Sequence, residues 1–241
     1  MRRFLIFHLY GPMAAWGEAA VGEYRPSAAH PGKSAVTGLL AAALGIRRDE
    51  EEKNRRLAES YGLGVRVDAG GELLRDYHTI QVPPARRKAR YLTRRDELAA
   101  DNRYTILSQR DYRVEAAWTC ALWAGENAPQ ELEALADALC RPRFTLYLGR
   151  KSCLPALPLN PKVVETETLR EAFDAHPPPE DLQELTRGQA PRYFWEQLSA
   201  EETGFEATWV APRRDKPLSR KRWQFGLREE FHTQLPKGET R

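Results

Sequence analysis

The sequence predicts an α+β protein, because strand-like and helix-like segments alternate in the order β, α, β, β, α, β. The first strand, from Arg3 to Tyr10, is a nearly continuous apolar run that ends at Gly11-Pro12. This order is typical of a ferredoxin-like (RRM-like) core, an antiparallel sheet of four strands with helices on one face. The same scaffold supports many RNA-recognition domains.

Two helices are predicted after the first strand. Ser34 to Leu44 places an apolar residue on one face at each turn, and Gly45 is a typical helix stop. Asp49 to Tyr61 is predicted as a second, solvated helix with acidic residues in its first turn. Leu63 to Asp68 then alternates like a strand, and Gly70-Gly71 predicts a turn.

The second half of the core is predicted from three further segments. Arg113 to Trp123 is a strong strand, and Pro129 to Leu139 is a compact amphipathic helix. Arg143 to Leu148 is predicted as the last strand, which leads into Gly149. We therefore expect residues 1–153 to form the core, with an insertion over about 80–112 that begins where Pro83-Pro84 breaks the strand.

From Leu154 onward the composition changes to a proline-rich connector. Thr168 to Ala175 is predicted as a short helix, and Tyr193 to Leu198 and Glu206 to Val210 as strands. We expect residues 154–241 to form a smaller C-terminal unit that contains β-strands.

The composition is that of an ordinary globular protein, with 41% hydrophobic and 29% charged residues in 241. No apolar stretch approaches the roughly 20 residues of a membrane span, and the N-terminus has no signal-peptide pattern. Three widely spaced cysteines are expected to be reduced thiols of a cytoplasmic protein. The net charge is only +3, so any nucleic-acid affinity must come from local patches.

The segment from Arg75 to Arg113 is the most prominent such patch. It contains ten lysine or arginine residues, with tyrosine and histidine rings between them. Cations neutralise phosphates and flat rings stack on bases, a combination that favours single-stranded nucleic acid. The alternative is a solvated charged arm, since five acidic residues partly offset the charge.

Two short segments could bind backbone phosphates. Lys33 and Ser34 open a helix, where free N–H groups favour an anion, although the glycine spacing of a Walker A loop is missing. The segment Tyr147 to Ser152 places a glycine, two cations and a hydroxyl at the end of a predicted strand. An ordinary surface turn is the alternative for the second segment.

Catalytic chemistry has little support in the sequence. The five histidines are scattered and show no metal-ligand spacing, so we expect neither a metal centre nor a cofactor. A metal-free ribonuclease would need a general base and an acid, roles that His30 or His78 could fill with Tyr77, Lys33 or Lys151.

Four blocks of sequence, in this order, resemble a known family. They are Gly11 to Gly17; Arg25-Pro26 with Lys33-Ser34 and Gly38 to Ile46; Arg75 to Thr79; and Arg143 to Cys153. Together they resemble the CasD family, the 5′-handle-binding subunits of type I-E CRISPR Cascade complexes within the repeat-associated mysterious protein superfamily.

The resemblance implies a non-catalytic subunit that caps the 5′ handle of a CRISPR RNA (crRNA). The insertion would be a thumb that folds over the RNA, with backbone subunits (CasC) beside it and the large subunit (CasA) near the handle. Target DNA would be approached only through the complex. A related type I-C subunit cuts CRISPR repeat RNA, which keeps a metal-independent endoribonuclease as the alternative.

Chemistry and resemblance together nominate a set of RNA-binding residues. They are Trp16, Arg25, Lys33, Ser34, Arg75, His78, Arg86, Arg87, Lys88, Tyr104, Arg110, Tyr147, Leu148, Gly149, Arg150, Lys151 and Ser152.

Overall fold

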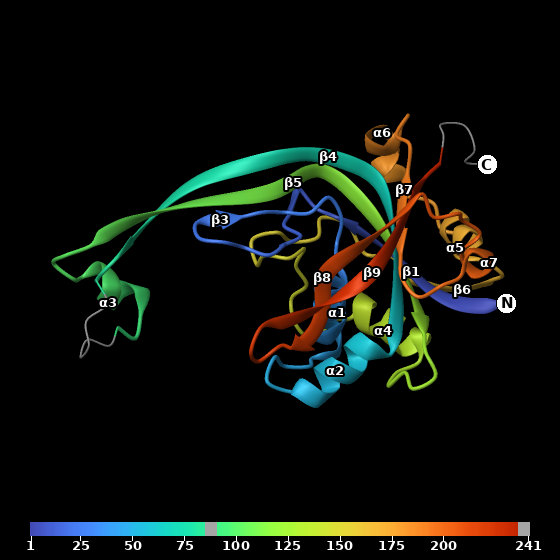
Figure 1. Ribbon diagram of the computed structural model, residues 1–241, viewed down its shortest axis with the longest axis horizontal. Helices are drawn as coiled ribbons and strands as arrows, with labels where there is room; N and C mark the ends of the chain where they lie inside the picture. Colours follow the sequence, from blue (N-terminus) through green and yellow to red (C-terminus); the bar gives the residue numbers. More distant parts are fainter. Residues whose placement is uncertain (85–90, 236–241) are drawn as a thin grey trace.

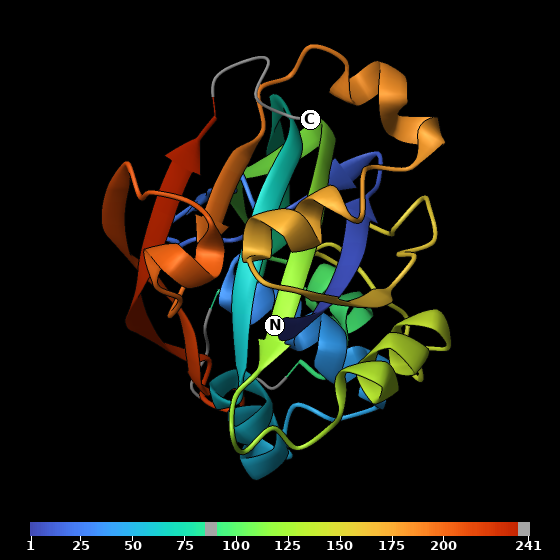
Figure 2. The same cartoon turned by 90° about the vertical axis from the view of Figure 1, so that its right-hand side faces the viewer.

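One large sheet organises the chain in the computed structural model, which describes residues 1–84 and 91–235. Its strands lie in the order β6-β1-β5-β4-β7-β9-β8, and the short strands β2 and β3 also pair with β5. All pairings are antiparallel except that of β3 with β5. The predicted α+β class is confirmed by this large antiparallel sheet with helices packed against it (Figures 1 and 2).

The described strands are nine. Their bounds are β1 Arg2–Tyr10, β2 Met13–Ala14, β3 Tyr24–Arg25, β4 Tyr61–Val82, β5 Tyr104–Ala124, β6 Lys162–Thr166, β7 Arg192–Trp195, β8 Trp209–Ser219 and β9 Gln224–Gln234. The described helices are α1 Lys33–Leu44, α2 Glu51–Glu59, α3 Arg94–Leu98, α4 Leu132–Cys140, α5 Leu169–Asp174, the 3₁₀ turn η1 Glu180–Leu182, α6 Gln183–Thr186 and α7 Ala200–Thr203. Helix α1 ends, as expected, at Gly45 in the left-handed region (φ 76°).

Both faces of the sheet are covered near its centre. Alternate residues of β1 enter two apolar clusters: Leu5 and Phe7 pack with α1 and α4, while Phe4 and Ile6 pack with Leu169 of α5 and its neighbours. A strand buried on both faces reads as a continuous apolar run, as β1 does. The two core helices, α1 and α4, therefore pack on one face, as expected, and segments after β6 cover the second face.

The predicted strand Arg143 to Leu148 is not a strand. Its backbone runs past the end of α1, with the N–H groups of Arg143 and Phe144 donating to the carbonyls of Ala43 and Ala42. Leu146 and Leu148 are buried and Tyr147 between them is exposed, an alternation that also occurs in strands. Alternation reports burial rather than strand pairing here, and β6, which follows the proline-rich connector, is the strand that pairs with β1.

The predicted turn at Gly70-Gly71 is also wrong, because β4 continues through it. Gly71 takes a positive φ of 58°, and a Cβ there would lie 2.1 Å from the carbonyl oxygen of Val114. Gly71 thus allows a left-handed backbone position within a long strand. Beyond it, β4 and β5 leave the body together as a two-stranded ribbon that carries α3 near its end (Figure 1).

The C-terminal strands extend the same sheet, since β7 pairs with β4 and β9 pairs with β7. The predicted strand Glu206 to Val210 begins later, at Trp209, and continues to Ser219; β9 was not predicted. The division into a core of residues 1–153 and a C-terminal unit of residues 154–241 stays a prediction. This boundary would place β1 and its pairing partner β6 in different units. Across residues 1–84 and 91–235, each helix is too short or too polar to cross a lipid bilayer.

Candidate nucleic-acid interface

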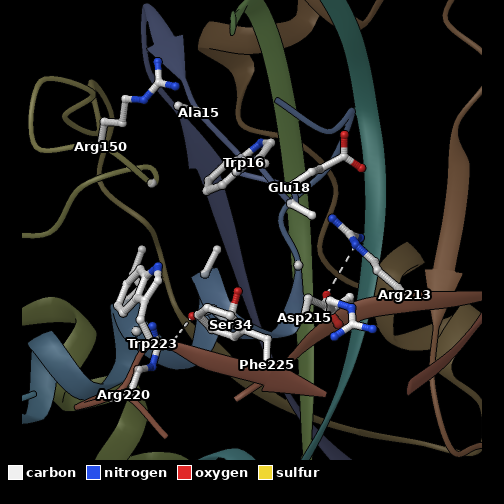
Figure 3. Close-up of a pocket in the computed structure, with 18 of the residues that line it drawn as sticks. Ala15, Trp16, Glu18, Ser34, Arg150, Arg213, Asp215, Arg220, Trp223 and Phe225 are labelled. Carbon is white, nitrogen blue, oxygen red and sulfur yellow. Dashed lines mark hydrogen bonds and ion pairs between the residues drawn. The ribbon is translucent and has the colours of Figure 1, made fainter. Parts of the chain in front are cut away.

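A groove of about 820 Å³ lies between the N-terminal loop and the β8–β9 hairpin (Figure 3). Its floor is one face of α1, where Ser34, Ala35, Gly38 and Ala42 are small residues. Its walls come from residues 15–19, the loop around Tyr147 to Arg150, and hairpin residues between 213 and 225. Segments distant in sequence therefore meet around one open, partly cationic hollow.

The loop Tyr147 to Ser152 forms one rim of the groove. Gly149 has φ 88°, and a Cβ there would lie 1.8 Å from the carbonyl oxygen of Ala15. The Ala15 N–H donates to the Leu148 carbonyl at 2.9 Å, and Leu148 itself is buried. The glycine therefore lets the loop pack against the N-terminal segment, and a contact of Gly149 with RNA stays a prediction.

The side chains of the same loop point to different environments. Tyr147 lines the groove and is 38% exposed, and Lys151 and Ser152 are exposed. The guanidinium carbon of Arg150 lies 4.5 Å from the ring centroid of Tyr112, so this cation packs over an aromatic face. The loop thus presents two cations beside the groove.

The root of the ribbon is fixed by a buried carboxylate. Asp111 accepts hydrogen bonds from Arg75 Nε at 2.8 Å and from the Tyr24 hydroxyl at 2.6 Å. The Arg75 hydrogen bond holds the pKa of Asp111 below its usual value, and the bond to Asp111 raises the pKa of Tyr24. Arg75 also stacks on Tyr24, 5.0 Å from its ring centroid. The predicted residue Arg75 therefore ties β4 to β5 and to the N-terminal loop.

Three other nominated ribbon residues, among those that the structure describes, lie outside the groove lining. His78 and Tyr104 are exposed on β4 and β5, and Arg110 pairs in register with Asp76. Arg86, Arg87 and Lys88 lie outside the described residues.

Two N-terminal candidates have mainly structural contacts. Trp16 is 2% exposed, packs edge-on against Trp118 and lines the groove. Arg25 is exposed on β3 and donates to the carbonyls of Gly22 and Tyr24.

Lys33 is not available to an anion, contrary to the expectation. It is 5% exposed; its Nζ donates to the Tyr61 carbonyl and forms an ion pair with Glu196. The α1 terminus is occupied too, because the Lys33 N–H donates to Asp215 Oδ2 at 2.8 Å. Of the predicted pair, only Ser34 lines the groove, and its carbonyl accepts a hydrogen bond from Arg220.

The histidines considered for catalysis are not brought together. His30 is buried, stacks on Phe194 and bonds to Glu230, and burial lowers its pKa to about 4. His78 lies on the exposed ribbon opposite Ser108. The part of the chain that the structure describes contains no group of three metal-ligating side chains placed to hold an ion.

The β8–β9 hairpin contributes groove residues that were not nominated. Arg214, Arg220, Trp223 and Phe225 all line the groove. The sequence does carry a signal for them, a basic run from Arg213 to Arg222 followed by aromatic residues. The pairing of β9 with β7, and of β8 with β9, places that run beside the groove.

Comparisons with known proteins agree with the resemblance seen in the sequence. Residues 4–230 match a family model described as CRISPR-associated protein (Cas_Cas5). The chain is 38% identical over 160 residues to the CRISPR system Cascade subunit CasD of Escherichia coli (strain K12), covering 66% of this chain and 70% of that protein.

Solved structures show the same fold. A chain of a CRISPR RNA-guided surveillance complex superposes with a TM-score of 0.65 at 24% identity, covering 96% of this chain and 90% of that one. A Cas protein crystal structure gives a TM-score of 0.59 at 26% identity, covering 97% and 95%. The chain belongs to the Cas5 family of CRISPR-associated proteins.

Proposed function

We propose that this protein is a non-catalytic subunit of a CRISPR Cascade surveillance complex that holds the 5′ handle of the crRNA. The observation that carries the proposal is the groove between the loop Tyr147 to Ser152 and the β8–β9 hairpin. This groove lies beside the root of the ribbon, where Arg75 of β4 pairs with Asp111 of β5. The relatives named as Cascade and surveillance-complex components support this role. CasC and CasA remain the proposed protein partners.

The chemistry of the groove suits single-stranded RNA. Four arginines line it (Arg150, Arg213, Arg214 and Arg220), against two acidic residues. Aromatic rings lie on the same walls, where unpaired bases could stack. The ribbon would act as the thumb, over residues that the sequence places at about 80–112, and its anchored root would fix where it reaches the RNA.

We also propose that β1, α1, β4, β5, α4 and β6 form a ferredoxin-like core. The strand order β6-β1-β5-β4 supports this, because the first and third strands of the unit lie at its centre.

The test is co-expression with the partner subunits and the CRISPR array, followed by purification of the complex. We expect Arg150→Ala and Lys151→Ala to reduce RNA retention and the salt dependence of binding, since each removes a phosphate contact. Arg55→Ala is the control, an exposed cation on α2 that lies outside the groove lining. Unchanged assembly and RNA retention in both groove variants would contradict the proposal.

The endoribonuclease hypothesis is tested separately. Pure protein is incubated with cognate repeat RNA in the presence of a chelator. A site-specific cut that disappears in His78→Ala or His30→Ala would favour it, whereas the separation of these histidines leads us to expect intact RNA.

A further inference from the structure

The turn between β8 and β9 presents a tryptophan in an unusual backbone conformation. Ser219 pairs with Gln224, and Trp223 is the last of the four turn residues between them. Its φ is 57°, in the left-handed region that a glycine adopts freely and a bulky residue rarely enters. Its side chain is 57% exposed at the groove. Strained backbone positions cluster at functional sites, and this one holds an exposed indole at a groove, so its position suggests a ligand.

The surroundings of Trp223 are cationic and aromatic. The guanidinium carbons of Arg48 and Arg220 lie 4.8 and 5.7 Å from its ring centroid, and Phe225 meets it edge-on at 5.3 Å. Lys221 and Arg222 are exposed in the same turn. An indole among several cations suits a polyanion with flat rings, which is the chemistry of single-stranded RNA.

Arg220 is built into the groove beneath the indole. It donates to the Ser34 carbonyl, and its burial lowers its pKa. Gly38 leaves the necessary space, because a Cβ at Gly38 would lie 3.1 Å from Arg220 Nη2. Tyr147 lies on the same groove and within electrostatic reach of Arg220. Arg220 therefore stands between the floor and two aromatic residues, with guanidinium donors beyond the one used by Ser34.

We propose that Trp223 is the stacking surface for one unpaired nucleobase of the bound RNA, with Arg220 donating hydrogen bonds to the base edge. This rests on the proposed RNA-binding function and adds to it a specific residue and a specific contact. The stacking contact would make the β8–β9 hairpin an RNA-binding element, in addition to the ribbon and the loop Tyr147 to Ser152.

The experiment combines protein variants with abasic RNA. The probe is fluorescein-labelled repeat RNA from the CRISPR array of the source genome, intact or with one base removed at each position in turn. The proteins are the full-length wild type, Trp223→Ala, Trp223→Gly and Trp209→Ala. Trp209 is a matched control, because it is 62% exposed on the same hairpin but lies outside the groove lining. Trp223→Gly relaxes the positive φ, so a fully folded variant without the ring is available.

In the wild type we expect one position where an abasic site weakens binding by roughly 5- to 100-fold. Trp223→Ala and Trp223→Gly should bind intact RNA more weakly by a similar factor and show no further loss at that position. Trp209→Ala should behave as the wild type. This non-additivity identifies the ring and the base as partners.

Equal affinity of wild type and both Trp223 variants for RNA would overturn the inference and leave the proposed function intact. So would weaker assembly with protein subunits at unchanged RNA affinity, which would assign the indole to an acidic protein surface. If the wild type fails to bind RNA alone and in the assembled complex, the proposed function fails instead.

Discussion

At the scale of single residues, burial decides what Lys33 does. Its ammonium is paired with Glu196 in the interior, and burial lowers its pKa. Lys33→Met would leave the carboxylate without its main partner, and we expect the free energy of unfolding to fall by about 3 kcal/mol. Urea denaturation measures this loss. Lys216→Met removes an exposed lysine and should change stability by less than about 0.5 kcal/mol. If Lys33→Met instead bound RNA more weakly at unchanged stability, Lys33 would be a phosphate-binding residue, as the sequence suggested.

Gly38 matters through its small size, because Arg220 packs directly beside it. Gly38→Ala adds a methyl group 3.1 Å from Arg220 Nη2, so the guanidinium must shift. Within a helix the same change gains up to about 1 kcal/mol. We expect RNA affinity to fall severalfold while the thermal midpoint stays equal or rises. Ala42→Gly, also on the groove floor, leaves Arg220 undisturbed and should lower stability instead. A weaker fold with normal RNA affinity in Gly38→Ala would contradict this reasoning.

At the scale of elements, the ribbon depends on its root. Asp111 is 1% exposed and receives hydrogen bonds from Arg75 and Tyr24, which joins β4, β5 and the N-terminal loop. Asp111→Ala should cost about 1–3 kcal/mol locally, because it removes the shared acceptor. We expect faster hydrogen–deuterium exchange in β3 and in distal β5, and weaker RNA retention.

Asp76→Ala is the matched control for the ribbon. Its carboxylate is half-exposed and lies 3.8 Å from His78, so its loss should leave exchange and RNA retention near wild type. Equal exchange in the two variants would show that the ribbon holds its position without the Asp111 contacts.

At the scale of the whole molecule, the sequence predicted elements better than it predicted contacts between distant ones. A continuous apolar run located β1 and apolar periodicity located α1, because the burial of a single element follows from the order of its own residues. Arg143 to Leu148 was wrongly predicted as a strand, because its backbone hydrogen-bonds to the end of α1 rather than to a neighbouring strand. Trp223 and the buried state of Lys33 both depend on where β8 and β9 lie, and that follows from long-range pairing with β7.

The histidines make the stability of the whole fold depend on pH. Burial, helped by the nearby charges of His176 and Arg66, lowers the pKa of His8 to about 3. Burial also lowers the pKa of His30 to about 4, although Glu230 opposes the shift. Both rings are neutral when folded, whereas the unfolded chain takes up their protons near pH 6.5. The unfolded state therefore binds more protons between pH 6.5 and 4, and stability must fall as the pH falls through that range.

For His30 alone this loss amounts to about 3 kcal/mol by pH 4, from the pKa difference and 1.36 kcal/mol per unit. Urea denaturation at pH 7.5, 6, 5 and 4.5 should show a steadily decreasing midpoint. His30→Gln should flatten part of that slope, since glutamine has no proton to gain, while His78→Gln, on the exposed ribbon, should keep it. A midpoint that stays constant from pH 7.5 to 4.5 would mean that His30 and His8 are not buried as neutral rings, and that the packing of His30 against Phe194 opens in solution.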